Sequence, residues 1–126
     1  MEIFKNIKFN SQGLVPVIIQ EIKTKKVLML GWMNKEALEK TMTTGKVHFW
    51  SRSRKRLWLK GETSGHYQLV KEIYLDCDGD ALLIEVEQIQ GACHTGYYSC
   101  FFRRINPQGG LEVVGTKVFH PQKVYK

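Results

Sequence analysis

The first pattern along the chain is a pair of runs rich in β-branched and aliphatic residues, 15–22 and 26–33, with the polar residues 23–25 between them. Two apolar runs of this length around a short polar segment are typical of a β-hairpin. We therefore predict two antiparallel strands in this part of the chain.

A helix is predicted directly after the second run, over residues 35–44. Asn34 stands at the N-cap position, where its side chain satisfies a free backbone N–H, and Gly45 is a typical helix stop because glycine readily adopts a left-handed conformation. Leu38 and Met42 are one helical turn apart, so we expect both to face the core. This is the only long helix that the pattern supports.

The rest of the chain alternates strand-forming runs with turn residues. Segment 106–110, Asn-Pro-Gln-Gly-Gly, has strong turn chemistry because proline fixes φ and glycine permits positive φ. The pattern therefore predicts an α+β fold, mostly antiparallel β with one principal helix, in a single domain over residues 1–126. The further strands are expected at 46–53, 56–60, 67–87, 97–105 and 111–119.

The composition is that of a globular protein, with 43% apolar and 25% charged residues in a chain of 126. This length is enough for a substantial core, so a metal site would serve chemistry rather than hold the fold together. No apolar run is long enough to cross a bilayer, and the first residues do not resemble a signal peptide. Because the three cysteines are an odd number, we expect reduced thiols in the cytoplasm.

The formal net charge of +7 indicates an anionic partner or substrate, and segment 52–56 places four cations within five residues. Nucleic acids, phosphorylated metabolites and acidic surfaces are all anionic partners that this charge would attract. Guanidinium and ammonium groups bind phosphate, and Trp50 and Trp58 are near enough in sequence to stack on a base. A solvated basic turn and a nucleic-acid-binding surface are the alternatives.

Segment 76–80, Asp-Cys-Asp-Gly-Asp, is the densest cluster of metal-ligand residue types. In an extended segment Asp76, Asp78 and Asp80 would share one face and Cys77 would point to the other. Three neighbouring carboxylates raise one another's pKa unless a cation lies between them, and Mg²⁺ prefers such oxygen ligands. Two metal sites of different chemistry are therefore expected.

A second interpretation of segment 76–80 is a solvated acidic turn in front of a strand. A calcium-binding loop is disfavoured, because its sixth position counted from Asp76 is Ala81 rather than glycine and no flanking amphipathic helices are predicted. The residues alone leave the metal site and the solvated turn open as alternatives.

Cys93 and Cys100 lie on either side of a glycine-bearing turn that can bring their thiols together. With Cys77 they offer three soft ligands for Zn²⁺ and leave the fourth tetrahedral position to water, as in a catalytic zinc site. His94 is either a further ligand or a proton carrier. The spacing differs from the paired C-x₂-C of a structural zinc ribbon, and unligated thiols are the alternative.

Taken together and in this order, these blocks resemble the phosphoribosyl-AMP cyclohydrolase family, which opens the adenine ring of 1-(5-phosphoribosyl)-AMP in histidine biosynthesis. The resemblance extends over about residues 13–103. The matching blocks are 31–34, 48–54, 60–66, 76–80 and 92–100. The segment that follows, 105–126, is too short for the pyrophosphohydrolase domain to which some relatives are fused.

The resemblance implies two kinds of metal ion and a homodimer in which the zinc ligands of each active site come from both subunits. Zinc is expected at thiolates and magnesium at carboxylates. The implied ligands are Cys77, Cys93 and Cys100 for zinc, and Asp76, Asp78 and Asp80 for magnesium.

The implied reaction is hydrolysis of the N1–C6 bond of the substituted adenine ring to a formamidine-linked imidazole carboxamide ribonucleotide. Zinc lowers the pKa of water and so provides hydroxide near neutral pH for attack at C6. We assign proton transfer to His94 and the two substrate phosphates to Arg52, Arg54 and Lys60. The sequence does not decide whether His66 takes part.

Two other classes of protein are weighed against this enzyme. A zinc-dependent nucleic-acid-binding module predicts tight, salt-sensitive binding to oligonucleotides, and a structural metal protein predicts unfolding when the metal is removed. Neither explains three soft ligands next to a histidine. The expected partner is therefore a small phosphorylated nucleotide, not nucleic acid or a membrane.

Overall fold

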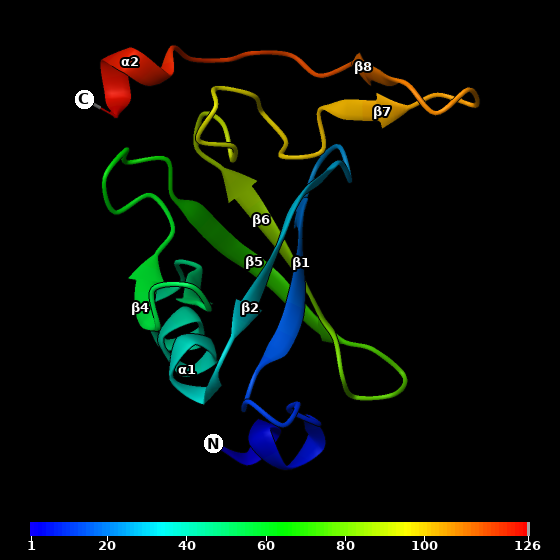
Figure 1. Cartoon of the computed structure of the whole chain (residues 1–126). Helices are drawn as coiled ribbons and strands as arrows, with labels where there is room; N and C mark the ends of the chain where they lie inside the picture. Colours follow the sequence, from blue (N-terminus) through cyan, green and yellow to red (C-terminus); the bar gives the residue numbers. More distant parts are fainter. Residues whose placement is uncertain (126) are drawn as a thin grey trace.

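A four-stranded sheet forms the centre of the molecule in the computed structural model, which describes residues 1–125 (Figure 1). Its order is β2-β1-β6-β5, with β1 and β6 parallel and the two edge strands antiparallel to their neighbours. The predicted hairpin is confirmed as β1 and β2. The strands are β1 (Val15–Glu21), β2 (Val27–Met33), β5 (Gln68–Leu75) and β6 (Leu82–Gln88).

Helix α1 (Lys35–Thr44) has the predicted bounds and the predicted caps. The Asn34 side chain accepts a hydrogen bond from the backbone N–H of Ala37 at 2.8 Å, and Gly45 has a φ of 75°. Leu38 is buried as expected, but the inward orientation predicted for Met42 is wrong, because this side chain is 43% exposed. The inward position belongs to Thr41, whose hydroxyl accepts from the His48 backbone N–H at 2.9 Å.

A two-stranded sheet of β3 (His48–Ser51) and β4 (Arg56–Leu59) follows the helix and contacts both α1 and β2. Its buried anchor is Phe49, which is 1% exposed. Gly31 of β2 allows this approach, because a Cβ there would lie 2.5 Å from the Phe49 ring. The ring of Trp58 packs against Phe49 with centroids 5.2 Å apart, so β4 is fixed to the core at that point.

The core lies between the central sheet, α1 and β3. Val15, Val17 and Ile19 of β1 are fully buried whereas Ile18 between them is 37% exposed, as strand alternation requires. No helix among residues 1–125 is long and apolar enough to cross a membrane. The observed elements agree with the predicted α+β class of mostly antiparallel strands with one main helix.

The strand predicted over 67–87 is wrong in its middle, because a turn at residues 76–81 separates β5 from β6. The Asp76 carboxylate accepts hydrogen bonds from the backbone N–H groups of Asp80 at 3.0 Å and Ala81 at 3.3 Å, which stabilises the turn. Gly79 has a φ of 76°. The argument from alternating strand faces therefore does not apply, and the acidic-turn interpretation of the backbone is correct.

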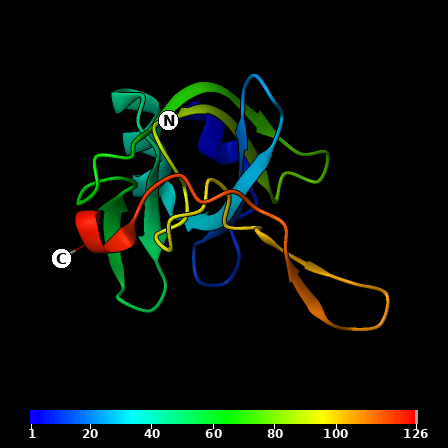
Figure 2. The ribbon, with the colours of Figure 1, turned by 90° about the horizontal axis from the view of Figure 1, so that it is seen from above.

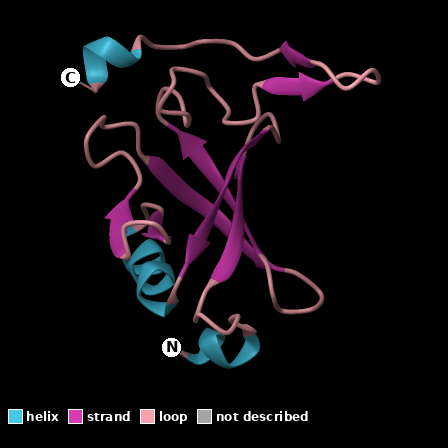
Figure 3. Ribbon diagram, in the orientation of Figure 1, coloured by secondary structure: helices cyan, strands magenta, loops and turns pink. Residues whose placement is uncertain are grey.

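The last third of the chain has much less regular structure than predicted. Residues 89–102 form a long loop, and only β7 (Arg103–Ile105) and β8 (Leu111–Val113) pair as a short hairpin that extends from the body (Figures 2 and 3). The predicted turn between them is confirmed. Two short helices, η1 (Glu2–Asn6) and α2 (Pro121–Val124), were not predicted.

Candidate active site

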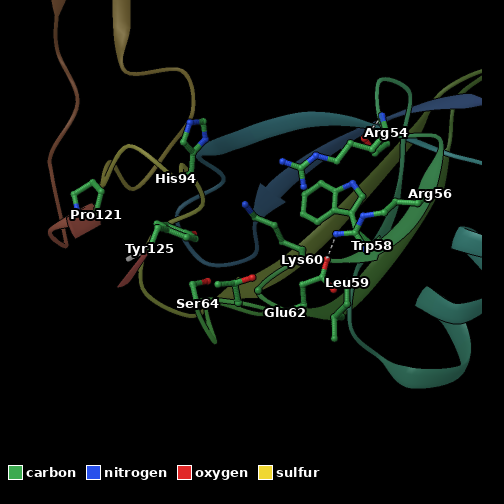
Figure 4. A pocket seen from close by; sticks show the side chains of 13 residues that line it. Arg54, Arg56, Trp58, Leu59, Lys60, Glu62, Ser64, His94, Pro121 and Tyr125 are labelled. Carbon is green, nitrogen blue, oxygen red and sulfur yellow. Dashed lines mark hydrogen bonds and ion pairs between the residues drawn. The ribbon is translucent and has the colours of Figure 1, made fainter. Parts of the chain in front are cut away.

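A cleft of about 630 Å³ opens where β4 and the turn after it meet the loop that carries His94 and the last residues of the chain (Figure 4). Segments far apart in sequence meet here, and Figure 4 shows His94 and Tyr125 on the side opposite Arg54 and Arg56. The polar and aromatic groups that line the cleft include Arg54, Trp58, Lys60, Ser64, His94 and Tyr125.

Positive charge in the cleft is only partly neutralised. Arg56 pairs with Glu62 at 3.1 Å. Within the described part of the chain, the Arg54 guanidinium has no ion-pair partner. Lys60 is half-buried, and desolvation lowers the pKa of its ammonium, with the nearby thiols of Cys100 and Cys93 opposing the shift. An anionic ligand in this cleft would therefore meet two cations without carboxylate partners.

Arg52, the third cation assigned to phosphate, lies elsewhere. Its guanidinium stacks over Trp32, 4.5 Å from the ring centroid, and it lines a separate hollow with Gln12 and Ser53. The structure therefore brings Arg54 and Lys60 into one cleft and places Arg52 outside it.

One of the two tryptophans considered for base stacking lines the cleft. Trp58 is held by its contact with Phe49 and forms part of the wall, whereas Trp50 is not among the lining residues. A flat aromatic surface next to free cations suits a ligand with both a heterocyclic ring and a phosphate.

The two downstream cysteines lie together at the loop between β6 and β7. The backbone N–H of Ala92 donates to Tyr98 at 2.9 Å and that of Cys93 to Tyr97 at 3.2 Å, so the chain folds back on itself. The backbone of Cys100 is held by its N–H, which donates to the Leu28 carbonyl at 2.7 Å. Burial and the adjacent Cys93 thiol raise the pKa of Cys100 to about 11, and the Lys60 ammonium opposes this rise.

His94 follows Cys93 in the chain, and its exposed side chain lines the cleft. The Cys93 sulfur lies 2.9 Å from the Thr95 hydroxyl. A titratable side chain thus stands beside a pair of thiols and faces the cations across the cleft (Figure 4).

Cys77 lies away from the other two thiols within one chain. It is exposed in the turn before β6, whereas Cys93 follows the end of that strand, and β6 is roughly 20 Å long at about 3.3 Å per residue. Figure 1 shows this turn and the loop after β6 at opposite ends of the sheet. The three predicted zinc ligands are therefore not brought together by one copy of the chain.

The three carboxylates of segment 76–80 do lie together. One oxygen from each of Asp76, Asp78 and Asp80 lies within 4.8 Å of the others, and all three residues are exposed. Desolvation opposes ionisation of Asp76, but hydrogen bonds from Asp80 and Ala81 outweigh it and lower the pKa of Asp76. Desolvation and the adjacent Asp76 carboxyl raise the pKa of Asp80.

His66, which the sequence left undecided, does not line the cleft. It is 8% exposed, and its ring meets Phe119 edge-on with centroids 4.6 Å apart. Desolvation and the nearby Lys60 ammonium lower the pKa of His66, and the Gly91 carbonyl opposes the shift.

Sequence reasoning missed several residues that line the cleft. Glu62 and Ser64 belong to the turn directly after β4, and the turn signal at residues 61–65 was available. Pro121 and Tyr125 come from the end of the chain, and no local pattern indicates that this segment folds back onto β4.

A cleft lined by an exposed histidine and cations without carboxylate partners, with two adjacent thiols on the loop that carries the histidine, is typical of an enzyme active site rather than of a structural surface. A model of the phosphoribosyl-AMP cyclohydrolase family matches residues 29–102. The phosphoribosyl-AMP cyclohydrolase of Pelotomaculum thermopropionicum is 57% identical over 95% of this chain, which covers 93% of that relative. The phosphoribosyl-AMP cyclohydrolase of Chlorobium phaeovibrioides is 52% identical over 94% of this chain, which covers 87% of that relative. The chain therefore belongs to the phosphoribosyl-AMP cyclohydrolase family, an enzyme family of histidine biosynthesis.

A longer relative has the same region as part of a larger protein. The histidine biosynthesis bifunctional protein HisIE of Thermoanaerobacter pseudethanolicus is 56% identical over 98% of this chain. The chain spans 57% of that protein's length, so the similarity concerns about half of it.

Proposed function

We propose that this chain is a metal-dependent hydrolase that opens the N1–C6 bond of the adenine ring of 1-(5-phosphoribosyl)-AMP and releases the formamidine-linked imidazole carboxamide ribonucleotide. Membership of the family supports the reaction. The observation in the fold that carries the proposal is the cleft, where Trp58 and Arg54 face His94, the residue that follows Cys93 in the chain. Such a cleft offers a ring surface, a phosphate site and a proton carrier together.

Zinc is proposed at Cys93, Cys100 and Cys77. The donors fit the ion, because zinc binds thiolates well and the first two thiols already lie against each other. Zinc, when bound, supplies an activated water for attack on the ring. Since Cys77 lies at the far end of β6, we propose that the third thiolate comes from a second copy of the chain, in a homodimer with two shared sites.

The arm of β7 and β8 supports association with a second copy. Ile105, Leu111 and Val113 are 73%, 61% and 62% exposed on this short hairpin, which projects from the body (Figure 2). An isolated two-stranded hairpin is at best marginally stable in water, and an exposed apolar patch of this kind marks an interaction surface. Burial of these side chains against a second copy would stabilise the hairpin and remove the apolar patch from water.

Within the cleft the chain's own groups divide the remaining tasks. His94 transfers the proton to the ring nitrogen as the C–N bond opens. Arg54 and Lys60 bind phosphate, and Trp58 packs against the heterocycle. Arg52 contributes to the second phosphate only if the ligand extends to the hollow beside Trp32.

Magnesium is proposed at Asp76, Asp78 and Asp80. Three oxygen donors within 4.8 Å suit a hard divalent cation, whose charge would offset the repulsion between neighbouring carboxylates that raises the pKa of Asp80. The three free thiols of the chain agree with a cytoplasmic location, which we also propose.

The proposed reaction is tested by following the ultraviolet absorbance change of ring opening with purified protein and 1-(5-phosphoribosyl)-AMP. The same protein is then stripped of metal with a chelator and reloaded with zinc. We expect turnover to disappear with chelation and return with zinc. Absence of turnover in the folded, zinc-loaded protein, together with tight salt-sensitive binding to oligonucleotides, would instead support a nucleic-acid-binding module.

A further inference from the structure

Lys60 is fixed at both ends of its side chain. Its backbone N–H donates to the carbonyl of the buried Val47 at 3.0 Å, which ties it to the core. The side chain passes Trp58, with the ammonium 5.7 Å from the ring centroid. The ammonium then donates to the backbone carbonyl of Ala92 at 2.5 Å. A lysine placed only to attract phosphate needs no such partner.

The Ala92 carbonyl belongs to the loop that carries Cys93 and His94. Apart from this bond, no hydrogen bond or ion pair joins segment 56–64 to segment 91–96 within residues 1–125. Elsewhere in the loop, the Gly96 carbonyl accepts from the Val118 backbone N–H at 2.7 Å, and the Gly91 carbonyl lies beside His66, which does not line the cleft. Lys60 therefore makes the one polar connection between the two walls of the cleft in the described structure.

We propose that Lys60 is a positioning residue, which holds the loop of Cys93 and His94 against β4 through the Ala92 carbonyl and so sets where His94 stands in the cleft. This role goes beyond phosphate binding, because an ammonium has three N–H donors and the Ala92 carbonyl uses one of them. The kinetic consequence rests on the proposed function, whereas the effect on the loop does not.

Two variants separate the roles of Lys60. Lys60→Met keeps the length and apolar stem of the side chain but removes the donor, and Lys60→Arg restores donors and charge. The matched control is Lys40→Met, at an exposed lysine of α1 that does not line the cleft. Amide hydrogen exchange is measured by mass spectrometry for peptides over residues 91–97 and over β1 and β2, without substrate, and kcat and KM are measured separately.

We expect exchange in residues 91–97 to become about tenfold faster or more in Lys60→Met and to stay unchanged in β1 and β2. The value of kcat should fall by about tenfold or more, because the bound substrate meets a displaced His94, and KM should rise as well, because the ammonium that binds phosphate is lost. Lys60→Arg should regain most of the loop protection, and Lys40→Met should match the parent protein.

Unchanged exchange at residues 91–97 in Lys60→Met would overturn the proposal. A raised KM with unchanged kcat would also overturn it, since that result describes a phosphate ligand alone. Faster exchange throughout the sheet would mean a general loss of stability and would likewise count against a positioning role. The exchange measurement uses no substrate, so it stands whether or not the proposed reaction is correct.

Discussion

At the scale of single residues, two neighbours in the sequence have side chains in different surroundings. Cys93 and His94 are adjacent in the chain, yet the thiol is buried and the imidazole is exposed to the cleft. That these two residues lie close together was predictable, because they are neighbours in one short segment. The contact of Lys60 with Ala92, 32 residues later, was not, because no local pattern reports which carbonyl a long side chain reaches.

Replacement of His94 by alanine tests proton transfer. Because the imidazole lines the cleft without a structural partner in the described residues, we expect His94→Ala to keep its zinc while kcat falls by about 10²–10⁴. Ring opening measured by absorbance, together with the zinc content of the purified variant, checks this. Loss of zinc from His94→Ala would make this residue a metal ligand instead.

His66 gives the free energy of unfolding a pH dependence with a definite sign. Its pKa is lowered from the ordinary 6.5 by desolvation and by Lys60, so the unfolded chain binds a proton more readily than the folded one. We therefore expect stability to decrease as the pH falls from above 6.5 down to the folded-state pKa. Urea unfolding of metal-free protein between neutral and mildly acidic pH measures this.

The control for that experiment is His66→Gln, which removes the titrating ring. Its overall stability should be lower because the contact with Phe119 is lost, but this part of the pH dependence should disappear. An equal slope in parent and variant would show that other groups account for the acid sensitivity.

At the scale of elements, helix α1 illustrates what local signals determine. Asn34→Ala removes the acceptor for the Ala37 backbone N–H, and we expect the free energy of unfolding to fall by about 1 kcal/mol. Asn34→Asp keeps an acceptor, so its free energy of unfolding should stay within roughly a few tenths of a kcal/mol of the parent value. Chemical denaturation of the three proteins decides, and an unchanged stability for Asn34→Ala would contradict the capping role.

Elements were predictable from the sequence where the determining contacts are local. The β1–β2 hairpin and α1 are specified by short turns and caps within the segments themselves. The parallel pairing of β1 with β6 joins strands about 65 residues apart and has no such signal. The turn at 76–81 was mistaken for a strand because side-chain capture of backbone N–H groups by Asp76 overrides the β-rich flanks.

For the candidate site, the sequence indicated residue types and segments but not their arrangement. The basic segment and the cysteine loop were singled out, yet only part of the first reaches the cleft, since Arg52 stacks on Trp32. The closing wall formed by Tyr125 was not predictable, because it depends on where the end of the chain packs.

At the scale of the whole molecule, the separation of the thiols is the basis of the assembly that we propose. One chain brings Cys93 and Cys100 together and holds Cys77 at the opposite end of β6. A symmetric dimer can combine the two ends of different copies twice, which gives two equivalent sites. The central claim is therefore that each zinc site takes ligands from two chains.

Mixing two inactive variants tests that claim most directly. Cys77→Ser and Cys93→Ser should each be inactive as pure dimers, because every site lacks one ligand. When the two are dissociated, mixed in equal amounts and reassociated, each mixed dimer has one site with all its thiols, so about a quarter of the parent ring-opening activity should return. If the mixture stays inactive although mixed dimers form, each site takes its ligands from a single chain and the account of a shared site is contradicted.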